Sequence, residues 1–231
     1  MARLHRSRFH FTWLQIVTHL GSLAPLGVMI WDGVHGNGNM AVNPIQELTF
    51  RTGKTALVLL CLSLCCTPLN SIFGFHQAIK LRRPLGVYAF LYVLGHFSIF
   101  LFDYNFDPSM LYDAIFNQRY VLVGFAAFLI LLPLAVTSTK GWQKRLGKNW
   151  IKLHRWVYLA AVLVIIHFVW LVKADVRQPL EFGAGLLALF IVRIPAVKRA
   201  LRAAAQMLVP RRGGRPPEPR RSTPEAITSH D

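Results

Sequence analysis

Residues 152–172 read KLHRWVYLAAVLVIIHFVWLV, an apolar stretch long enough to cross a lipid bilayer as a single helix. His154 lies near its start and His167 lies thirteen residues further on, which separates them by about 20 Å along a helix. Ionisable side chains are costly inside a membrane helix and mark function there. Two histidines at two depths of one span therefore suggest ligands of a metal or of heme iron, and an electron path across the membrane.

Similar apolar stretches recur along the 231 residues, of which 54% are hydrophobic. A chain that crosses a bilayer must pair its own backbone groups, so it forms helices or a closed barrel. Long unbroken apolar runs exclude a barrel, whose strands alternate. The sequence predicts an all-α membrane protein, a six-transmembrane-helix bundle over residues 11–197. Its spans are expected at 11–31, 52–73, 84–102, 120–136, 152–172 and 179–197, and the sixth has an uninterrupted apolar part of only 182–192.

The formal net charge is +16, and the basic residues concentrate in alternate connections between the spans. They gather in the arm 1–10, in the loop 74–83, in the loop 137–152 and in the tail, whereas the other connections carry Asp and Glu. The positive-inside rule then places both termini in the cytoplasm. The Pro-rich, basic tail 198–231 is expected to be a disordered cytoplasmic segment. The same distribution argues against nucleic-acid binding, which needs a continuous basic footprint.

This topology places two histidines of different spans at similar depths. His96 lies some twelve residues into the third span and His167 some fifteen into the fifth. They could supply both axial ligands of one heme iron in the bundle core, or they could be interhelical hydrogen-bonding groups. His154, beside Arg155, favours an interfacial position. On an ideal helix His154 and His167 point about 140° apart, so they do not point the same way unless the helix is tilted or distorted, or the hemes sit on different flanks.

Three segments in matching order resemble the MsrQ family, formerly called YedZ: RPLGVYAFLYVLGHF (83–97), LAVTSTKGWQKRLG (134–147) and LHRWVYLAAVLVIIHFVWLVKADVRQPL (153–180). The resemblance covers about residues 43–193. It implies a heme-binding, multi-pass subunit of the bacterial inner membrane, in the ferric reductase-like superfamily related to NADPH oxidases. Such a subunit passes electrons to MsrP, a periplasmic molybdopterin enzyme that repairs oxidised proteins by reducing methionine sulfoxide. It also implies heme b, one or two per chain, and FMN, which would make the chain a flavoprotein.

By position, the resemblance implies that His96, His167 and His154 bind heme iron. The related oxidases use two histidines on each of two helices, spaced thirteen or fourteen residues apart, to hold two stacked hemes. Here Arg83 and Arg82 stand thirteen and fourteen residues before His96. A guanidinium is no ordinary axial ligand, but it could bind a heme propionate. The partner of His154 therefore stays open, since the resemblance supports neither of the other histidines on that side, His76 and His19.

The source of the electrons follows from what comes after the sixth span. The related oxidases carry a flavin and nicotinamide domain there, whereas about thirty-five residues without a G-x-G-x-x-G motif follow it here. Electrons are therefore expected from quinol or from a separate cytosolic flavin reductase. The basic loops fit an acidic donor or an FMN phosphate, but they fit a topology signal equally well. The acidic connection 103–119 is expected to dock the periplasmic partner.

The chain is thus expected to be an electron-transfer subunit of an oxidoreductase system and not its catalytic subunit. Two alternatives stay open. One is a stand-alone transmembrane ferric reductase, and the other is a non-heme transporter or channel whose pathway includes His96 and His167.

Overall fold

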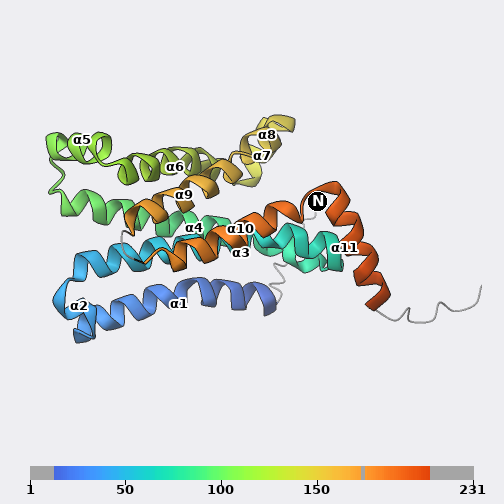
Figure 1. The fold of residues 1–231 in the computed structure, drawn as a ribbon, viewed down its shortest axis with the longest axis horizontal. Helices are drawn as coiled ribbons and strands as arrows, with labels where there is room; N and C mark the ends of the chain where they lie inside the picture. Colours follow the sequence, from blue (N-terminus) through green and yellow to red (C-terminus); the bar gives the residue numbers. More distant parts are fainter. Residues whose placement is uncertain (1–12, 173–174, 209–231) are drawn as a thin grey trace, which may run out of the picture.

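The computed structural model describes residues 13–172 and 175–208, and each regular element in these ranges is an α-helix (Figure 1). By length and composition, five helical stretches can cross a membrane, or six if α10 and α11 form one bent span. The predicted all-helical membrane bundle is therefore confirmed. The predicted arm 1–10 and residues 209–231 of the predicted tail lie outside the described residues. The helices are α1 (Trp13–His35), α2 (Asn39–Val42), α3 (Pro44–Phe73), α4 (His76–Asp103), α5 (Pro108–Asn117), α6 (Arg119–Val136), α7 (Lys140–Leu146), α8 (Lys148–His154), α9 (Val157–Leu171), α10 (Arg177–Ile191) and α11 (Pro195–Leu208).

Successive long helices run back and forth, so α1 begins at the same end of the bundle as α7, α8 and α11 (Figure 1). We call this end the basic end and the opposite end, with α2 and α5, the acidic end. In the described part of the chain, all acidic residues lie at the acidic end: Asp32, Glu47, Asp103, Asp107, Asp113, Asp175 and Glu181. Most described lysines and arginines lie at the basic end: Lys80, Arg82, Arg83, Lys140, Lys144, Arg145, Lys148, Lys152, Arg155, Arg193, Lys198, Arg199 and Arg202.

Helices α3 and α4 are longer than the apolar stretches that predicted them. Pro44 stands at the first turn of α3, and the Asn43 side chain caps it by accepting a hydrogen bond from the Gln46 amide. At the other end, Gly74 closes α3 in the left-handed conformation. The residues predicted as polar loop up to 51 and as basic loop 74–83 are therefore largely helical. Hydropathy locates the part of a helix that lies in lipid, whereas the capping residues set its ends.

The opening stretch forms two helices with a break in between. Helix α8 ends at His154 and α9 begins at Val157. In the break, the amides of Arg155 and Trp156 bond the carbonyls three residues back, at Lys152 and Leu153. This is the 3₁₀ pattern, which turns the chain by about 120° per residue instead of 100°. The helix is thus distorted between the two histidines, which is one of the alternatives that the sequence left open for their directions.

The sixth span differs from its prediction. Helix α10 ends at Ile191, and α11 departs from it at 88°. Pro195 begins α11, and a proline disfavours helical geometry in the residue before it, so the helix breaks there. Residues 198–208, predicted as the start of a disordered tail, are helical. The fifteen residues of α10 span about 22 Å, less than the hydrocarbon thickness of about 30 Å.

Two helix pairs form the body of the bundle. Helix α3 packs along α4, α6 packs along α9, and contacts between the two pairs are few. Helix α1 lies against the first pair, α10 lies against α9 and α3, and both helices extend the apolar core. The central buried residues of this core are Leu59, Leu60, Leu64, Ala89, Tyr92, Ala161 and Leu186.

A tyrosine of α4 stabilises the proline-interrupted helix α1. Pro25 lacks an N–H, so α1 cannot keep a regular hydrogen-bond ladder there. The Tyr92 hydroxyl donates to the Ser22 carbonyl, at 2.8 Å, and accepts from the Leu26 amide, at 3.1 Å. It therefore bridges the amide and carbonyl that a regular helix would pair directly.

Replacing Tyr92 by phenylalanine removes this bridge and leaves an amide and a carbonyl without that partner in an apolar environment. We expect Tyr92→Phe to lower the free energy of unfolding by about 1–3 kcal/mol, measured by thermal unfolding of the purified protein in detergent. Tyr112→Phe is the control, because the Tyr112 side chain is exposed, and it should leave the free energy of unfolding unchanged. An equal loss in both variants would contradict the bridging role.

Candidate functional site

A central cavity of about 970 Å³ lies between the α3–α4 pair and the α6–α9 pair. It reaches from Tyr104 and Tyr120 at the acidic end to Gln143 and Trp150 at the basic end. Cofactor sites are typically apolar cavities of about 300–1,000 Å³ with a few placed polar groups. Among the described histidines, those that line the cavity are His96, His154 and His167.

His96 of α4 and His167 of α9 face each other across the half of the cavity nearer the acidic end. Their ring centroids are 6.3 Å apart and the ring planes are perpendicular. Each Nδ1 bonds a backbone carbonyl: His96 bonds Thr49 of α3 at 2.8 Å, and His167 bonds Tyr120 of α6 at 2.7 Å. A carbonyl oxygen only accepts, so each Nδ1 carries the proton and each Nε2 keeps its lone pair. Both rings are thereby fixed in the tautomer that ligates a metal through Nε2.

The distance between the rings suits one metal ion held by both. Imidazole nitrogens bind a metal such as zinc at about 2.0–2.1 Å, and each ring centroid lies about 1.1 Å behind its nitrogen, so two ligands in line place the centroids roughly 6.3 Å apart. No group of three or more His, Cys, Asp and Glu side chains placed to hold a metal exists within the described residues. Two imidazoles suit an iron whose other ligands belong to a macrocycle.

Glycines leave space for both imidazole rings, and the two halves of the site share the same spacing of carbonyl, glycine and histidine. A Cβ on Gly53 would lie 3.1 Å from His96 Nδ1, and a Cβ on Gly124 would lie 2.6 Å from His167 Nδ1. Each glycine stands four residues after the residue whose carbonyl bonds the imidazole, and each histidine stands 47 residues after that residue. Helix pair α3–α4 and helix pair α6–α9 thus present their histidines in the same way.

His154 lies at the basic end of the same cavity. Its ring stacks on Trp150, with centroids 3.9 Å apart, and its Nδ1 bonds the Trp150 carbonyl at 3.2 Å. Its Nε2 is buried and has no hydrogen-bond partner within the described residues. Arg82 and Arg83 of α4 line this end as well. The end therefore offers one bare imidazole nitrogen and two guanidinium groups, which suit a group that has both a metal and anionic substituents.

The structure does not bring His19, His76 or the cysteines of the described chain into this cavity. His19 bonds the Tyr88 hydroxyl through Nδ1, at 3.0 Å, and lines a separate pocket of about 440 Å³ between α1 and α4. His76 begins α4 and is exposed. The three cysteines of α3 are free thiols, of which Cys66 is buried in the apolar core, and none lines the cavity.

Sequence reasoning missed the residues that orient the rings. These are the carbonyl groups of Thr49 and Tyr120 and the glycines Gly53 and Gly124. A backbone carbonyl that accepts such a bond cannot be identified from the sequence, because every residue has a carbonyl group. The shared spacing of glycine and histidine, 43 residues in both halves, was the available signal.

Comparison with known proteins gives one consistent answer. Residues 52–166 match the family described as ferric reductase like transmembrane component. The protein-methionine-sulfoxide reductase heme-binding subunit MsrQ of Xanthomonas axonopodis pv. citri is 39% identical over 180 residues, which is 76% of this chain and 82% of that protein. The MsrQ subunit of Deinococcus radiodurans is 39% identical over 197 residues, 85% of this chain and 96% of that protein.

The chain belongs to the MsrQ family. The family predicted from the three sequence motifs is therefore confirmed. No solved structure matches the chain. The ferric reductase region, 52–166, runs from α3 into α9 and so takes in both helix pairs around the cavity of this MsrQ-family protein.

A side chain at position 124 would test how closely the site is packed. We expect Gly124→Ala to displace the His167 imidazole, break its bond to the Tyr120 carbonyl and cost about 1–3 kcal/mol of unfolding free energy. Gly95→Ala is a sharp control, because Gly95 precedes His96 directly and a Cβ there meets nothing within 4 Å. Thermal unfolding of the two variants should differ, and equal midpoints would contradict the close packing of Gly124.

Proposed function

We propose that this chain is a transmembrane electron-transfer subunit that holds heme b between His96 and His167. It passes electrons to a periplasmic, molybdopterin-dependent protein-methionine-sulfoxide reductase of the MsrP kind, for repair of oxidised periplasmic proteins. One observation carries the proposal. Two imidazoles on different helices face each other at a metal-bridging distance, and backbone carbonyls fix each in the ligating tautomer. The names of the relatives, heme-binding subunits of such a reductase, support the same assignment.

The residues at this site would have different roles in binding the heme. His96 and His167 would be the axial ligands, and the carbonyls of Thr49 and Tyr120 would hold their rings in place. Phe97 belongs to an aromatic wall of the cavity and stacks on Phe128 with centroids 4.5 Å apart, and this wall would keep water away from a bound heme. Heme iron, when bound, changes oxidation state by one electron, and this apolar, hydrogen-bonded setting tunes its potential.

The basic end of the cavity would hold a second group. His154 offers a lone pair at Nε2, and Arg82 and Arg83 would bind propionates of a heme there. The same guanidinium groups also fit the phosphate of FMN, the flavin that the family resemblance implies. His154 is therefore the proposed ligand of a second heme iron, with FMN as the other cofactor that this end suits.

The charge distribution supports one orientation in the membrane. Basic residues collect at the end with α7, α8 and α11, and acidic residues collect at the other end. The positive-inside rule then places the basic end, and with it both termini, in the cytoplasm of a bacterial cell. Electrons would enter at His154 from quinol or from a cytosolic flavin reductase and leave beyond His96 and His167.

The chemistry at the sulfoxide belongs to the partner. Reduction of one methionine sulfoxide takes two electrons and two protons and releases methionine and water. A heme carries one electron at a time, so the subunit would deliver two electrons in succession for each turnover.

A second function is favoured by a specific finding, the match of residues 52–166 to the ferric reductase family. The chain would then reduce ferric complexes at its outer face without a protein partner. Purified protein in proteoliposomes separates the two functions. A stand-alone reductase reduces added ferric complexes at a rate that the periplasmic reductase does not change.

Removing either facing imidazole should remove the heme between them. We expect His96→Ala and His167→Ala each to lose that heme, seen as a lower heme-to-protein ratio and a smaller reduced-minus-oxidised visible spectrum. His35→Ala is the matched control, because His35 also lies at the acidic end but is exposed and stacks on Trp31. Wild-type heme content in both the His96→Ala and the His167→Ala variant would overturn the assignment, and a wild-type protein without any heme would favour a transporter or channel.

The second site can be tested separately. We expect His154→Ala to remove the heme at the basic end and to leave the spectrum of the His96–His167 heme unchanged. Heme quantification per chain measures the loss of the heme at the basic end. The visible spectrum measures whether the His96–His167 heme is unchanged. If His154→Ala keeps the full wild-type heme content, His154 holds no iron and the basic end is assigned to another cofactor.

A further inference from the structure

One lysine of α3 lies in the wall of the central cavity, at a depth where hydrocarbon surrounds the bundle. The apolar part of α4 runs from 84 to 102 and covers about 28 Å, close to the hydrocarbon thickness. His96 stands six residues before the end of this part, which is about 9 Å inside the border at the acidic end. Gly53 is level with His96, because a Cβ there would lie 3.1 Å from its Nδ1. Lys54 follows Gly53 directly and therefore lies at the same depth.

Lys54 is the cation in the half of the cavity that contains the two facing imidazoles. The charged side chains among the described residues that line the cavity are Lys54, Arg82, Arg83 and Asp103. The two arginines belong to the basic end, and Asp103 is exposed at the last residue of α4. Charged side chains at membrane depth are costly, so they face the interior of a bundle and pair with an opposite charge there.

A second cation of the same helix, Arg51, shows what Lys54 lacks. Arg51 donates to Asp32 at 2.6 Å and to Glu47 at 2.7 Å, so two carboxylates of the chain balance its charge. Lys54 stands three residues further into the membrane and takes part in neither of the two ion pairs that the described residues form. A cation in an apolar setting needs an anion, and the described part of the chain gives Lys54 none.

The other role of a lysine near a membrane border is to extend toward the lipid headgroups. The five bonds of the Lys54 side chain, each about 1.5 Å long, reach roughly 6 Å from its Cα. The border of the hydrocarbon at the acidic end lies about 9 Å away, so the ammonium of Lys54 does not reach it. The side chain lines the cavity instead.

The proposed occupant of the cavity carries the anion that Lys54 needs. Heme b bears two propionate groups, which are ionised at neutral pH, and a carboxylate that leaves water requires a cation or several hydrogen-bond donors. An ammonium has three N–H donors and a full positive charge. It suits a carboxylate better than the neutral amides and hydroxyls that line the same end of the cavity, at Asn43, Gln46 and Tyr120.

We propose that Lys54 binds a propionate of the heme that His96 and His167 ligate. The proposal rests on the proposed function, because that function supplies the heme. Lys54 neutralises one carboxylate at the acidic half of the cavity, as Arg82 and Arg83 would at the basic end. Its role is to retain the heme, while the two imidazoles hold the iron.

The experiment follows how fast the full chain loses heme b. The chain carries His154→Ala, so that the His96–His167 site is the one followed, and it is produced without heme and then loaded in detergent. Serum albumin in excess takes up released heme, and the visible spectrum records the loss. We expect Lys54→Met, which keeps the stem but removes the charge, to lose heme b about tenfold faster. Lys54→Arg keeps the charge and should restore the slow rate.

A second probe separates the propionates from the rest of the heme. Heme b dimethyl ester has no carboxylate charge, so the chain with Lys54 and the Lys54→Met variant should lose the ester at equal rates. Equal rates of loss for heme b itself would overturn the proposal. The same acceleration with the ester as with heme b would overturn it too, because Lys54 would then act on the packing of the site and not on a carboxylate.

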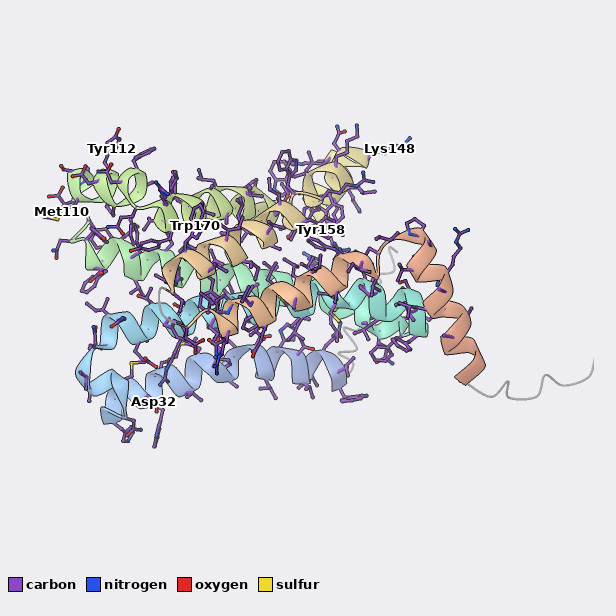
Figure 2. The ribbon with its side chains drawn as sticks, viewed as in Figure 1. Asp32, Met110, Tyr112, Lys148, Tyr158 and Trp170 are labelled. Atoms are coloured by element: carbon purple, nitrogen blue, oxygen red, sulfur yellow. The ribbon has the colours of Figure 1, made fainter. Side chains whose placement is uncertain are left out.

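Lys148→Met is the matched control for the loss of a lysine charge. Lys148 is exposed on α8, and Figure 2 shows it at the opposite end of the bundle from Asp32. This variant should lose heme b at the unchanged rate, and an acceleration equal to that of Lys54→Met would contradict the role of Lys54. Failure of the proposed function gives a different result, since a wild-type chain that takes up no heme b contradicts that function itself.

Discussion

Two hydrogen bonds from imidazole Nδ1 atoms to backbone carbonyls determine how the rest of the bundle is built. In lipid a polar group without a partner costs several kcal/mol, so each ring needs an acceptor for its Nδ1–H. Thr49 and Tyr120 supply their carbonyls from the helix next to each histidine. A ring that lies so close to a neighbouring helix leaves no space for a Cβ, which is why glycine follows four residues later in both. The spacing of each helix pair and the direction of both rings follow from this arrangement.

The same constraint explains the cavity. Within each pair the helices touch closely, while the two pairs stay apart and leave about 970 Å³ between them. Close packing is the normal state of a protein interior, so a large apolar cavity with three inward-facing histidines is a feature that a cofactor would complete. The two ends of the cavity differ in charge, because one lies at the basic end of the bundle and the other at the acidic end. His154 shares the basic end with Arg82 and Arg83, whereas His96 and His167 lie toward the acidic end.

The sequence predicted the helices that can cross the membrane and the similar depths of His96 and His167, because hydropathy and helical rise determine both. It could not predict where helices end, since Asn43 and Gly74 extend or stop α3 through local capping bonds that hydropathy does not record. Nor could it place His154 in the same cavity as His167. That placement depends on the 3₁₀ turn at 155–156, which changes the angle between the two rings on one chain segment. The bend before Pro195 was likewise not predicted, because the sixth span was expected to run on to residue 197, past its uninterrupted apolar part.

The first turn of α6 links the surface of the protein to its interior. One residue, Tyr120, uses its carbonyl to orient His167 and its hydroxyl to hold Gln118 at the junction with α5. The ring of His167 lies against Gly124, where a Cβ would come within 2.6 Å of its Nδ1. Helix α5 is followed directly by the turn of α6 that positions His167. The junction of α5 with α6 and the orientation of the His167 ring therefore both depend on the same turn of backbone.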